Sequence, residues 1–360
     1  MKKLPSLNGW RMISITLVLL YHSSFTPGFP PQFLRLINGF DTGALGVRFF
    51  FVISGFLITF LLIQEQSKHG FINLKDFFLR RALRILPVYF AYLLALIFLT
   101  GFSQTPTDWL VNLTFTTDFH PTPYPTTHLW SLGVEEQFYL IWPCFLGAAV
   151  SHQGGVSKLL KILFMPLLVA PIVRMVGCEH AEPESLECLF QKGSFFARCD
   201  SLAYGSVAAV IFTKYRGQVD AFYTKNPRVS MGMGVTLLLT VPCLRFLHAP
   251  MIIQAGLSDS IQAIGFTLLL VQSILCPKHG PYRFLNWKWV AHLGILSYSI
   301  YIWQELFCTP DQPLFGFRGA WCVNFPGCIF TALFVAHGSY YLLEKPLLSL
   351  RAKFRPVLRE

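Results

Sequence analysis

The sequence predicts an all-α, polytopic membrane protein of about ten transmembrane helices with both termini in the cytoplasm. Of its 360 residues, 53% are apolar and only 13% are charged, whereas a typical soluble chain is about one-quarter charged. The apolar residues gather in segments long enough to cross a bilayer, and the basic residues gather between these segments. These observations exclude a cytosolic enzyme, a disordered scaffold and a nucleic-acid-binding protein, so no nucleic-acid partner is expected.

Ten segments carry most of the apolar residues. The core of a bilayer is about 30 Å thick, and a helix needs about 20 mostly apolar residues to cross it. The segments that fit are residues 7–25, 43–64, 84–101, 132–150, 159–177, 195–213, 229–247, 259–276, 290–308 and 322–343. The first could be read as a secretory signal, but Arg11 and His22 interrupt it and no A-x-A-like cleavage site follows. We therefore predict a retained first helix.

The basic residues set the predicted orientation. The net charge is +11, and many Lys and Arg residues lie within 65–84, within 214–228 or after the tenth segment. Residues 102–131 contain no Lys or Arg. Because cytoplasmic loops are enriched in Lys and Arg, both termini are predicted to be cytoplasmic. The chain then divides into a membrane domain, 1–350, and a basic cytoplasmic tail, 351–360.

The nine cysteines give little sign of a metal site or a disulfide framework. They form no C-x-x-C pair and no tight cluster with histidine, so no metal is expected. Cys178 and Cys188 share one predicted loop, where they could form a bridge or remain free thiols.

The first predicted helix carries two ionisable side chains, which inside a bilayer usually face a cavity or a partner. Arg11 and His22 are eleven residues apart, which is about three helical turns and about 16 Å of rise. They share one face, with Arg11 near the cytoplasmic boundary and His22 in the outer half. Taken singly, Arg11 could snorkel to lipid headgroups and His22 could be a packing residue, but the shared face weakens that explanation.

A basic cluster within Phe78–Pro87 enters the third predicted helix from the cytoplasm. Arg80 and Arg84 have i, i+4 spacing and Arg81 and Arg84 have i, i+3 spacing, so two or three guanidinium groups can converge on one anion. The alternative is a topology signal that binds the phosphates of membrane lipid. Glu344, at the end of the tenth predicted helix, could pair with Arg80 or Arg84.

Three further charged residues need partners. Arg48 lies within the second predicted span, and Glu135 or Asp200 could neutralise it. Arg198 and Asp200 enter the sixth predicted helix from the outer side. For these two, an internal ion pair is a simpler explanation than contact with a ligand.

The outer loop enters the fourth predicted helix through His128–Pro143, a segment that includes Ser131. Glu135 and Glu136 fall in the first turns of this helix, where the helix dipole favours carboxylates, and this is their structural explanation. They are also expected at about the depth of His22. A Glu within reach of a His commonly orients that imidazole as a general base.

These placements predict two functional layers. Arginines lie at the cytoplasmic mouth, and a histidine with carboxylates lies at the outer end. A multiply phosphorylated donor held from inside could present its reactive end to an acceptor outside.

The order of these motifs resembles acyltransferase family 3, the integral-membrane O-acyltransferases that modify bacterial cell-surface sugars. Any one motif is weak, but the set spans nearly the whole chain. The matching elements are Arg11 with His22, Gly46–Thr59, Arg80–Pro87, His128–Tyr139, Arg198 with Asp200, Leu293–Trp303 and Glu344–Pro346.

The resemblance implies a membrane acyltransferase in the plasma (inner) membrane. It implies an acyl-CoA donor, by default acetyl-CoA, that enters from the cytoplasm and is not a tightly bound cofactor. The acceptor would be a hydroxyl of an extracytoplasmic glycan or a lipid-linked sugar. Arg11 and His22 would be essential, and the arginines of the third predicted helix would handle the donor.

The sequence also departs from the family pattern. Gln304 stands where a histidine commonly follows the tryptophan, which puts a second histidine role in doubt. Arg48 stands where many members carry an acidic residue, and Asn8 replaces a frequent aspartate. No further domain is expected after the tenth predicted helix, so we expect the chain to resemble the single-module members.

The resulting hypothesis is that neutral His22 acts as general base on the acceptor hydroxyl, oriented by Glu135 or Glu136. Transient acylation of His22 is an alternative mechanism. Two other classes of function are a transporter or exporter of a glycan precursor or small metabolite, and a non-catalytic membrane receptor or assembly factor. Thioester consumption coupled to an acylated product distinguishes the enzyme from both.

Overall fold

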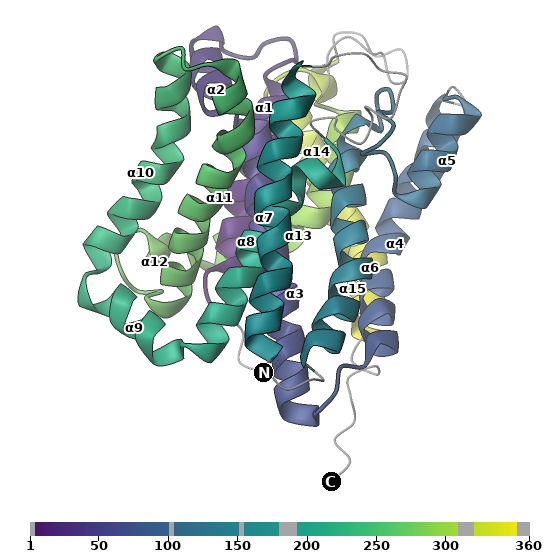
Figure 1. Cartoon of the computed structure of the whole chain (residues 1–360). Coiled ribbons are helices and arrows are strands. Elements are labelled where there is room, and N and C mark those ends of the chain that lie inside the picture. The colour runs from purple at the N-terminus through teal and green to yellow at the C-terminus, as the bar shows by residue number, and fades with distance from the viewer. Residues whose placement is uncertain (1–3, 101–103, 151–154, 180–192, 309–319, 351–360) are drawn as a thin grey trace.

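The computed structural model describes residues 4–100, 104–150, 155–179, 193–308 and 320–350, and within these ranges it contains helices and no strand (Figure 1). The all-α prediction is therefore confirmed for the described residues. The α-helices are α1 (Leu7–Ser23), α2 (Leu34–Phe40), α3 (Thr42–His69), α4 (Leu74–Thr100), α5 (Pro106–Thr114), α6 (Trp130–Val150), α7 (Gly155–Glu179), α8 (Phe195–Lys214), α9 (Arg216–Lys225), α10 (Pro227–Phe246), α11 (Met251–Leu275), α12 (Tyr282–Leu285), α13 (Lys288–Trp303), α14 (Gly327–Ser339) and α15 (Lys345–Leu350). Short 3₁₀ turns are η1 (Pro31–Phe33), η2 (Thr127–Leu129), η4 (Gln304–Leu306) and η6 (Trp321–Val323), and η7 (Tyr340–Glu344) is a π-helix.

Each of the ten predicted segments coincides with a helix, but the bounds differ. The largest difference is in α4, which begins at Leu74 rather than at residue 84. Asn73 precedes it, and the Asn73 side chain accepts a hydrogen bond from the backbone N–H of Asp76 at 3.1 Å, as an N-cap does. Hydropathy marks the apolar part of a helix and misses polar turns that continue it. The short helices α2, α5, α9, α12 and α15 were not predicted, because each is too short to cross a bilayer.

Six described helices are long and apolar enough to cross a membrane: α3, α4, α7, α8, α10 and α11. The protein is therefore a multi-pass membrane protein. Of the other predicted spans, α1, α13 and α14 have 17, 16 and 13 residues, and α6 carries Glu135, Glu136 and Gln137 in its first half. The total of ten spans and the cytoplasmic position of both termini stay predictions.

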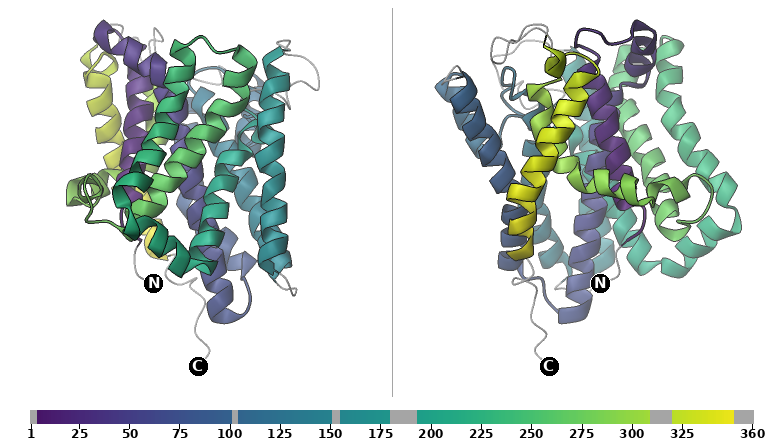
Figure 2. Two further views of the ribbon diagram at one scale, coloured as in Figure 1. Left: turned by 60° about the vertical axis from the view of Figure 1, so that its left-hand side comes forward. Right: turned by 180° about the vertical axis from the view of Figure 1, so that it is seen from behind.

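Helix α3 occupies the centre of the bundle between two apolar clusters. Its residues Phe51 and Ile58 belong to a cluster with α1, α4, α6 and α13, and Val52 and Phe56 belong to a second cluster with α8 and α11. A Cβ at Gly205 would clash with the backbone of α3, and a Cβ at Gly55 would clash with the backbone of α8, so α3 and α8 can pack closely because both positions are glycine. In contrast, α4, α7 and α10 lie at the outside of the bundle (Figure 2), and only 33%, 28% and 17% of the residues in their apolar stretches are buried inside the protein, as expected of lipid-facing helices.

Candidate active site

A pocket opens in the first apolar cluster, between α1, α3, α4, α6 and α13. Its wall includes three arginines, Arg11 of α1 and Arg81 and Arg84 of α4, together with Glu135 of α6. Arg81 and Arg84 reach the same wall because residues three apart lie on one face of a helix. Ser131 of α6 also lines the pocket, so the structure brings together five of the predicted site residues from three helices.

The three arginines of this pocket have no ion-pair partner among the described residues. The guanidinium carbon of Arg81 lies 4.9 Å from the centre of the Tyr139 ring, a cation–π contact that leaves its N–H groups available. Glu135 instead accepts a hydrogen bond from the Ser54 hydroxyl at 2.7 Å. Unpaired guanidinium groups on a pocket wall make a site for an anion.

Arg80 does not belong to this pocket. Its Nη2 lies 3.2 Å from Oε2 of Glu65 on α3, and it is absent from the pocket wall. The predicted convergence therefore holds for Arg81 and Arg84 and not for Arg80. The predicted ion pair of Glu344 with Arg80 or Arg84 is likewise not formed among the described residues. The buried Oε2 of Glu344 has no hydrogen-bond partner there, although its charge acts on Arg84.

At the far side of the pocket wall, a chain of hydrogen bonds leads to a second histidine. Ser131 and Tyr301 line the pocket, and their hydroxyl oxygens are 2.5 Å apart. The Tyr301 hydroxyl also donates to the backbone carbonyl of His128 at 2.7 Å. Nδ1 of His128 lies 2.5 Å from Oε2 of Glu305, and both side chains are buried.

The first histidine, His22, has an amide as its partner. Its Nδ1 lies 2.7 Å from Oε1 of Gln304, and Gln304 is next to Glu305 in the turn η4 that follows α13. We call His22, His128, Gln304 and Glu305 the histidine cluster. The charge of Glu305 acts on His22 as well as on His128, so the four side chains form one electrostatic unit.

The prediction that Glu135 or Glu136 orients His22 is therefore wrong. Neither Glu135 nor Glu136 contacts His22 within the described part of the chain; the packing of α1 against α13 brings Gln304 to it instead. Glu135 faces Ser54 of α3, and Oε1 of Glu136 is buried without a hydrogen bond. Nor is His22 among the residues of the pocket wall.

Glu305 was missed by the sequence analysis. It lies at the end of the predicted span 290–308, where an ionisable residue is a functional candidate by default. The position of Glu305 in a predicted span therefore marked it as a candidate. The sequence could not identify His128 as its partner, because the two residues are 177 positions apart in the chain.

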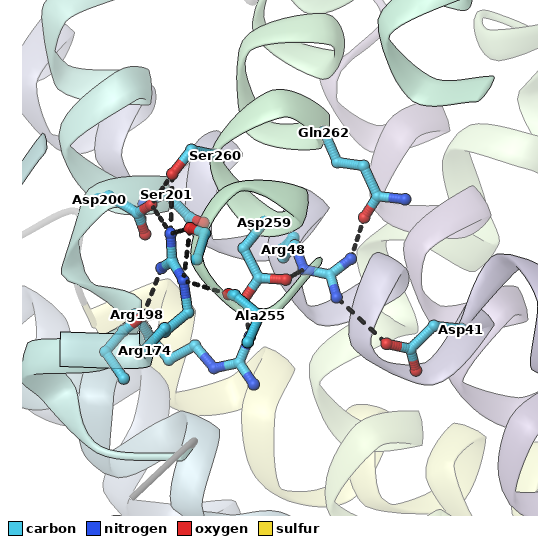
Figure 3. A network of polar contacts seen from close by, with 12 residues as sticks. Asp41, Arg48, Arg174, Arg198, Asp200, Ser201, Ala255, Asp259, Ser260 and Gln262 are labelled. Carbon is cyan, nitrogen blue, oxygen red and sulfur yellow. Dashed lines mark hydrogen bonds and ion pairs between the residues drawn. The ribbon is translucent and has the colours of Figure 1, made fainter. Parts of the chain in front are cut away.

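Arg48 and Arg198 belong to a different set of contacts, which joins α3, α7, α8 and α11 (Figure 3). Nε of Arg48 lies 2.8 Å from Oδ1 of Asp259, and Nη2 lies 3.3 Å from Asp41. Asp259 also pairs with Arg198. The prediction that Glu135 or Asp200 neutralises Arg48 is thus wrong.

The predicted pair of Arg198 with Asp200 is also wrong. Asp200 pairs with Arg174 of α7, with Nη2 and Oδ2 2.9 Å apart, and accepts a hydrogen bond from the Ser260 hydroxyl at 2.6 Å. The physical reason is that residues two apart point to different sides of a helix. Arg174 and Asp259 complete the network shown in Figure 3, and neither was singled out from the sequence.

Among the residues that the structure describes, no three His, Cys, Asp or Glu side chains come together as metal ligands. The proposed bridge between Cys178 and Cys188 and the basic tail 351–360 lie outside the described residues.

Comparison with known sequences identifies the class. The profile of acyltransferase family 3, described as an acyltransferase domain, matches residues 4–340, so the chain belongs to this family of acyltransferases and the resemblance seen in its motifs is confirmed. No solved structure matches the chain.

Individual relatives are named as O-acetyltransferases. The chain is 25% identical to the putative peptidoglycan O-acetyltransferase YrhL of Bacillus subtilis, a match that covers 96% of this chain and 55% of YrhL. It is 24% identical to the peptidoglycan O-acetyltransferase OatA of Listeria monocytogenes, over 87% of this chain and 50% of OatA. For the O-acetyltransferase OatA of Staphylococcus aureus the identity is 27%, over 84% and 50%. The chain therefore spans about half the length of these relatives.

Proposed function

We propose that this protein is an O-acetyltransferase of the plasma membrane that moves an acetyl group from cytoplasmic acetyl-CoA to a hydroxyl of an extracytoplasmic glycan or lipid-linked sugar. The proposal includes ten spans with both termini in the cytoplasm. The observation that carries it is the set of three unpaired arginines on the wall of a pocket inside the helix bundle.

The donor fits the arginines of this pocket. CoA carries a pyrophosphate and a further phosphate, and guanidinium groups bind phosphate oxygens in bidentate pairs. Arg11 and His22 are separated by about 16 Å along α1, a span that suits an extended pantetheine arm. Phosphates held by Arg11, Arg81 and Arg84 would place the thioester toward the histidine cluster.

In the proposed reaction, His22 is the general base for the acceptor. The Gln304 carbonyl oxygen can only accept a hydrogen bond, so Nδ1 of His22 donates to it at 2.7 Å and Nε2 carries the free lone pair. Nε2 takes the proton of the acceptor hydroxyl while the hydroxyl oxygen attacks the thioester carbonyl. Transient acylation of His22 Nε2 is the alternative pathway, and trapping a labelled acyl-histidine would identify it.

A glycan acceptor is supported by the relatives. Two of them are named for peptidoglycan, a polymer of hydroxyl-bearing sugars outside the cytoplasmic membrane. Because this chain matches only about half of each relative, we propose a hydroxyl-bearing glycan as the acceptor rather than peptidoglycan itself.

The test combines membranes with labelled donor and whole cells. Membranes containing the protein should convert radiolabelled acetyl-CoA to free CoA and labelled glycan, and mass spectrometry of envelope glycans should show the acetyl group only in cells that express it. His22→Ala should reduce transfer by about 10² to 10⁴. His120→Ala, which changes an exposed histidine, should leave transfer unchanged. Transport of label without thioester cleavage, or more than one-tenth of the activity in His22→Ala, would contradict the proposal.

A further inference from the structure

The two histidines of the cluster are held in unlike ways. His128 is held by a carboxylate: Oε2 of Glu305 lies 2.5 Å from its Nδ1 and also accepts its backbone N–H at 3.3 Å. His22 is held by the neutral amide of Gln304 at 2.7 Å. Since Gln304 and Glu305 are consecutive residues of one turn, a single turn holds both imidazoles.

The other ring nitrogen of His128 has no hydrogen-bond partner. Nε2 is buried, and the described residues provide nothing for it to bind, although His128 is only 3% exposed. The rings of Tyr92 and Tyr301 pack against the imidazole at centroid distances of 5.7 and 5.3 Å and fix its orientation. An unpaired polar atom in such a position is costly, which indicates that a bound molecule completes it.

The difference between the two partners indicates that His22 and His128 have different roles in the reaction. A carboxylate compensates the charge of an imidazolium, whereas an amide does not. Two titratable groups of one kind in unlike surroundings are the usual arrangement of an acid and a base. His128 is also connected to the donor pocket, because Tyr301 and Ser131 both line the pocket and bind its backbone carbonyl at 2.7 and 3.4 Å.

We propose that His128 is the general acid of the transfer and that Glu305 is its positioning residue, an inference that rests on the proposed function. The acceptor oxygen forms a bond to the acyl carbon, and its proton passes to His22. The carbon–sulfur bond breaks with its electron pair on sulfur, and Nε2 of His128 protonates this sulfur to give the free thiol of CoA. Proton exchange with water then returns both imidazoles to their starting states.

The experiment compares two donors that differ in one atom. In acetyl-seleno-CoA, selenium replaces the thioester sulfur and every phosphate is kept. A selenolate is a weaker base than a thiolate and leaves without a proton. With acetyl-CoA, His128→Gln should lower turnover by about 10² or more. With the selenoester, His128→Gln should recover to within about tenfold of wild type, whereas His22→Ala should show the same loss with both donors.

Further variants separate a catalytic role from a structural one. Glu305→Gln should follow the pattern of His128→Gln, the double variant should lose no more than either single one, and Glu305→Asp should regain part of the activity. Tyr92→Phe is the matched control, because it removes a buried hydrogen bond beside the His128 ring. Its turnover relative to wild type should be the same with both donors. Equal loss with both donors in His128→Gln would overturn the assignment. Absence of acetyl-CoA turnover in wild type would instead overturn the proposed function.

Discussion

The bundle contains two groups of arginines that look alike in the sequence and differ in the structure. In the network of Figure 3, Arg48, Arg174 and Arg198 are each paired with an aspartate. In the pocket, Arg11, Arg81 and Arg84 have no such partner among the described residues. Arg48 and Arg174 are buried, but Arg198 is half-buried like the arginines of the pocket, so burial alone does not separate the two groups.

The difference is one of charge compensation. A paired, buried guanidinium is satisfied by the protein itself and ties helices together, so removing its partner leaves an uncompensated charge. An unpaired guanidinium on a pocket wall is satisfied by a ligand instead. Within this fold, the paired group therefore serves stability and the unpaired group serves binding.

The largest expected effect comes from breaking the paired group. Asp259→Asn leaves Arg48 and Arg198 without the carboxylate that joins them, and loss of one partner from a buried pair costs about 3–5 kcal/mol. The free energy of unfolding in mixed micelles would measure this loss. Asp220→Asn is the control: it breaks the pair with Arg216, whose side chains are 51% and 45% exposed, and such pairs contribute about 0–1 kcal/mol. Similar losses of unfolding free energy in the two variants would contradict a structural role for the network.

Substitution of the unpaired arginines should lower the affinity for acetyl-CoA and leave the stability of the fold unchanged. Arg81→Lys and Arg84→Lys keep the charge but lose the bidentate fork, so acetyl-CoA affinity should fall about 10- to 100-fold, or about 1.4–2.7 kcal/mol, with an unchanged melting temperature. Calorimetric titration would measure the affinity. Arg80→Lys, on the same helix but paired with Glu65, should bind within about twofold of wild type. Equal affinities in all three variants would count against the pocket as the donor site.

A smaller effect is expected from a carboxylate that has amide donors and no arginine. Asp118, between α5 and α6, accepts hydrogen bonds from Gln137 Nε2 at 2.7 Å and the Phe195 N–H at 2.9 Å, and burial raises its pKa to about 6. Because the folded state then binds its proton more tightly than the unfolded state, stability should fall as pH rises from about 4 through about 6, and by about 1 kcal/mol between pH 5 and pH 7.5. Unfolding measured at pH 5 and pH 7.5 would check this, and Asp118→Asn should remove the contribution. Stability that rises over this interval only in wild type would contradict it.

The sequence was sufficient to locate the long helices but not to identify which charged residues on different helices pair with one another. Apolar segments located ten helices because burial in lipid demands about 20 apolar residues, and the spacing of Arg81 and Arg84 predicted their common face. Pairing depends on how distant helices pack. Nothing local indicates that Arg48 meets Asp259, that Arg174 meets Asp200, or that Gln304 and Glu305 face His22 and His128.

The most direct measurement is a cryo-electron microscopy structure of the full chain in lipid nanodiscs with CoA. We expect phosphate density within hydrogen-bond distance of at least two of Arg11, Arg81 and Arg84, with the thiol directed toward His22 and His128. CoA bound at another site while these three guanidinium groups remain without a ligand would contradict the account.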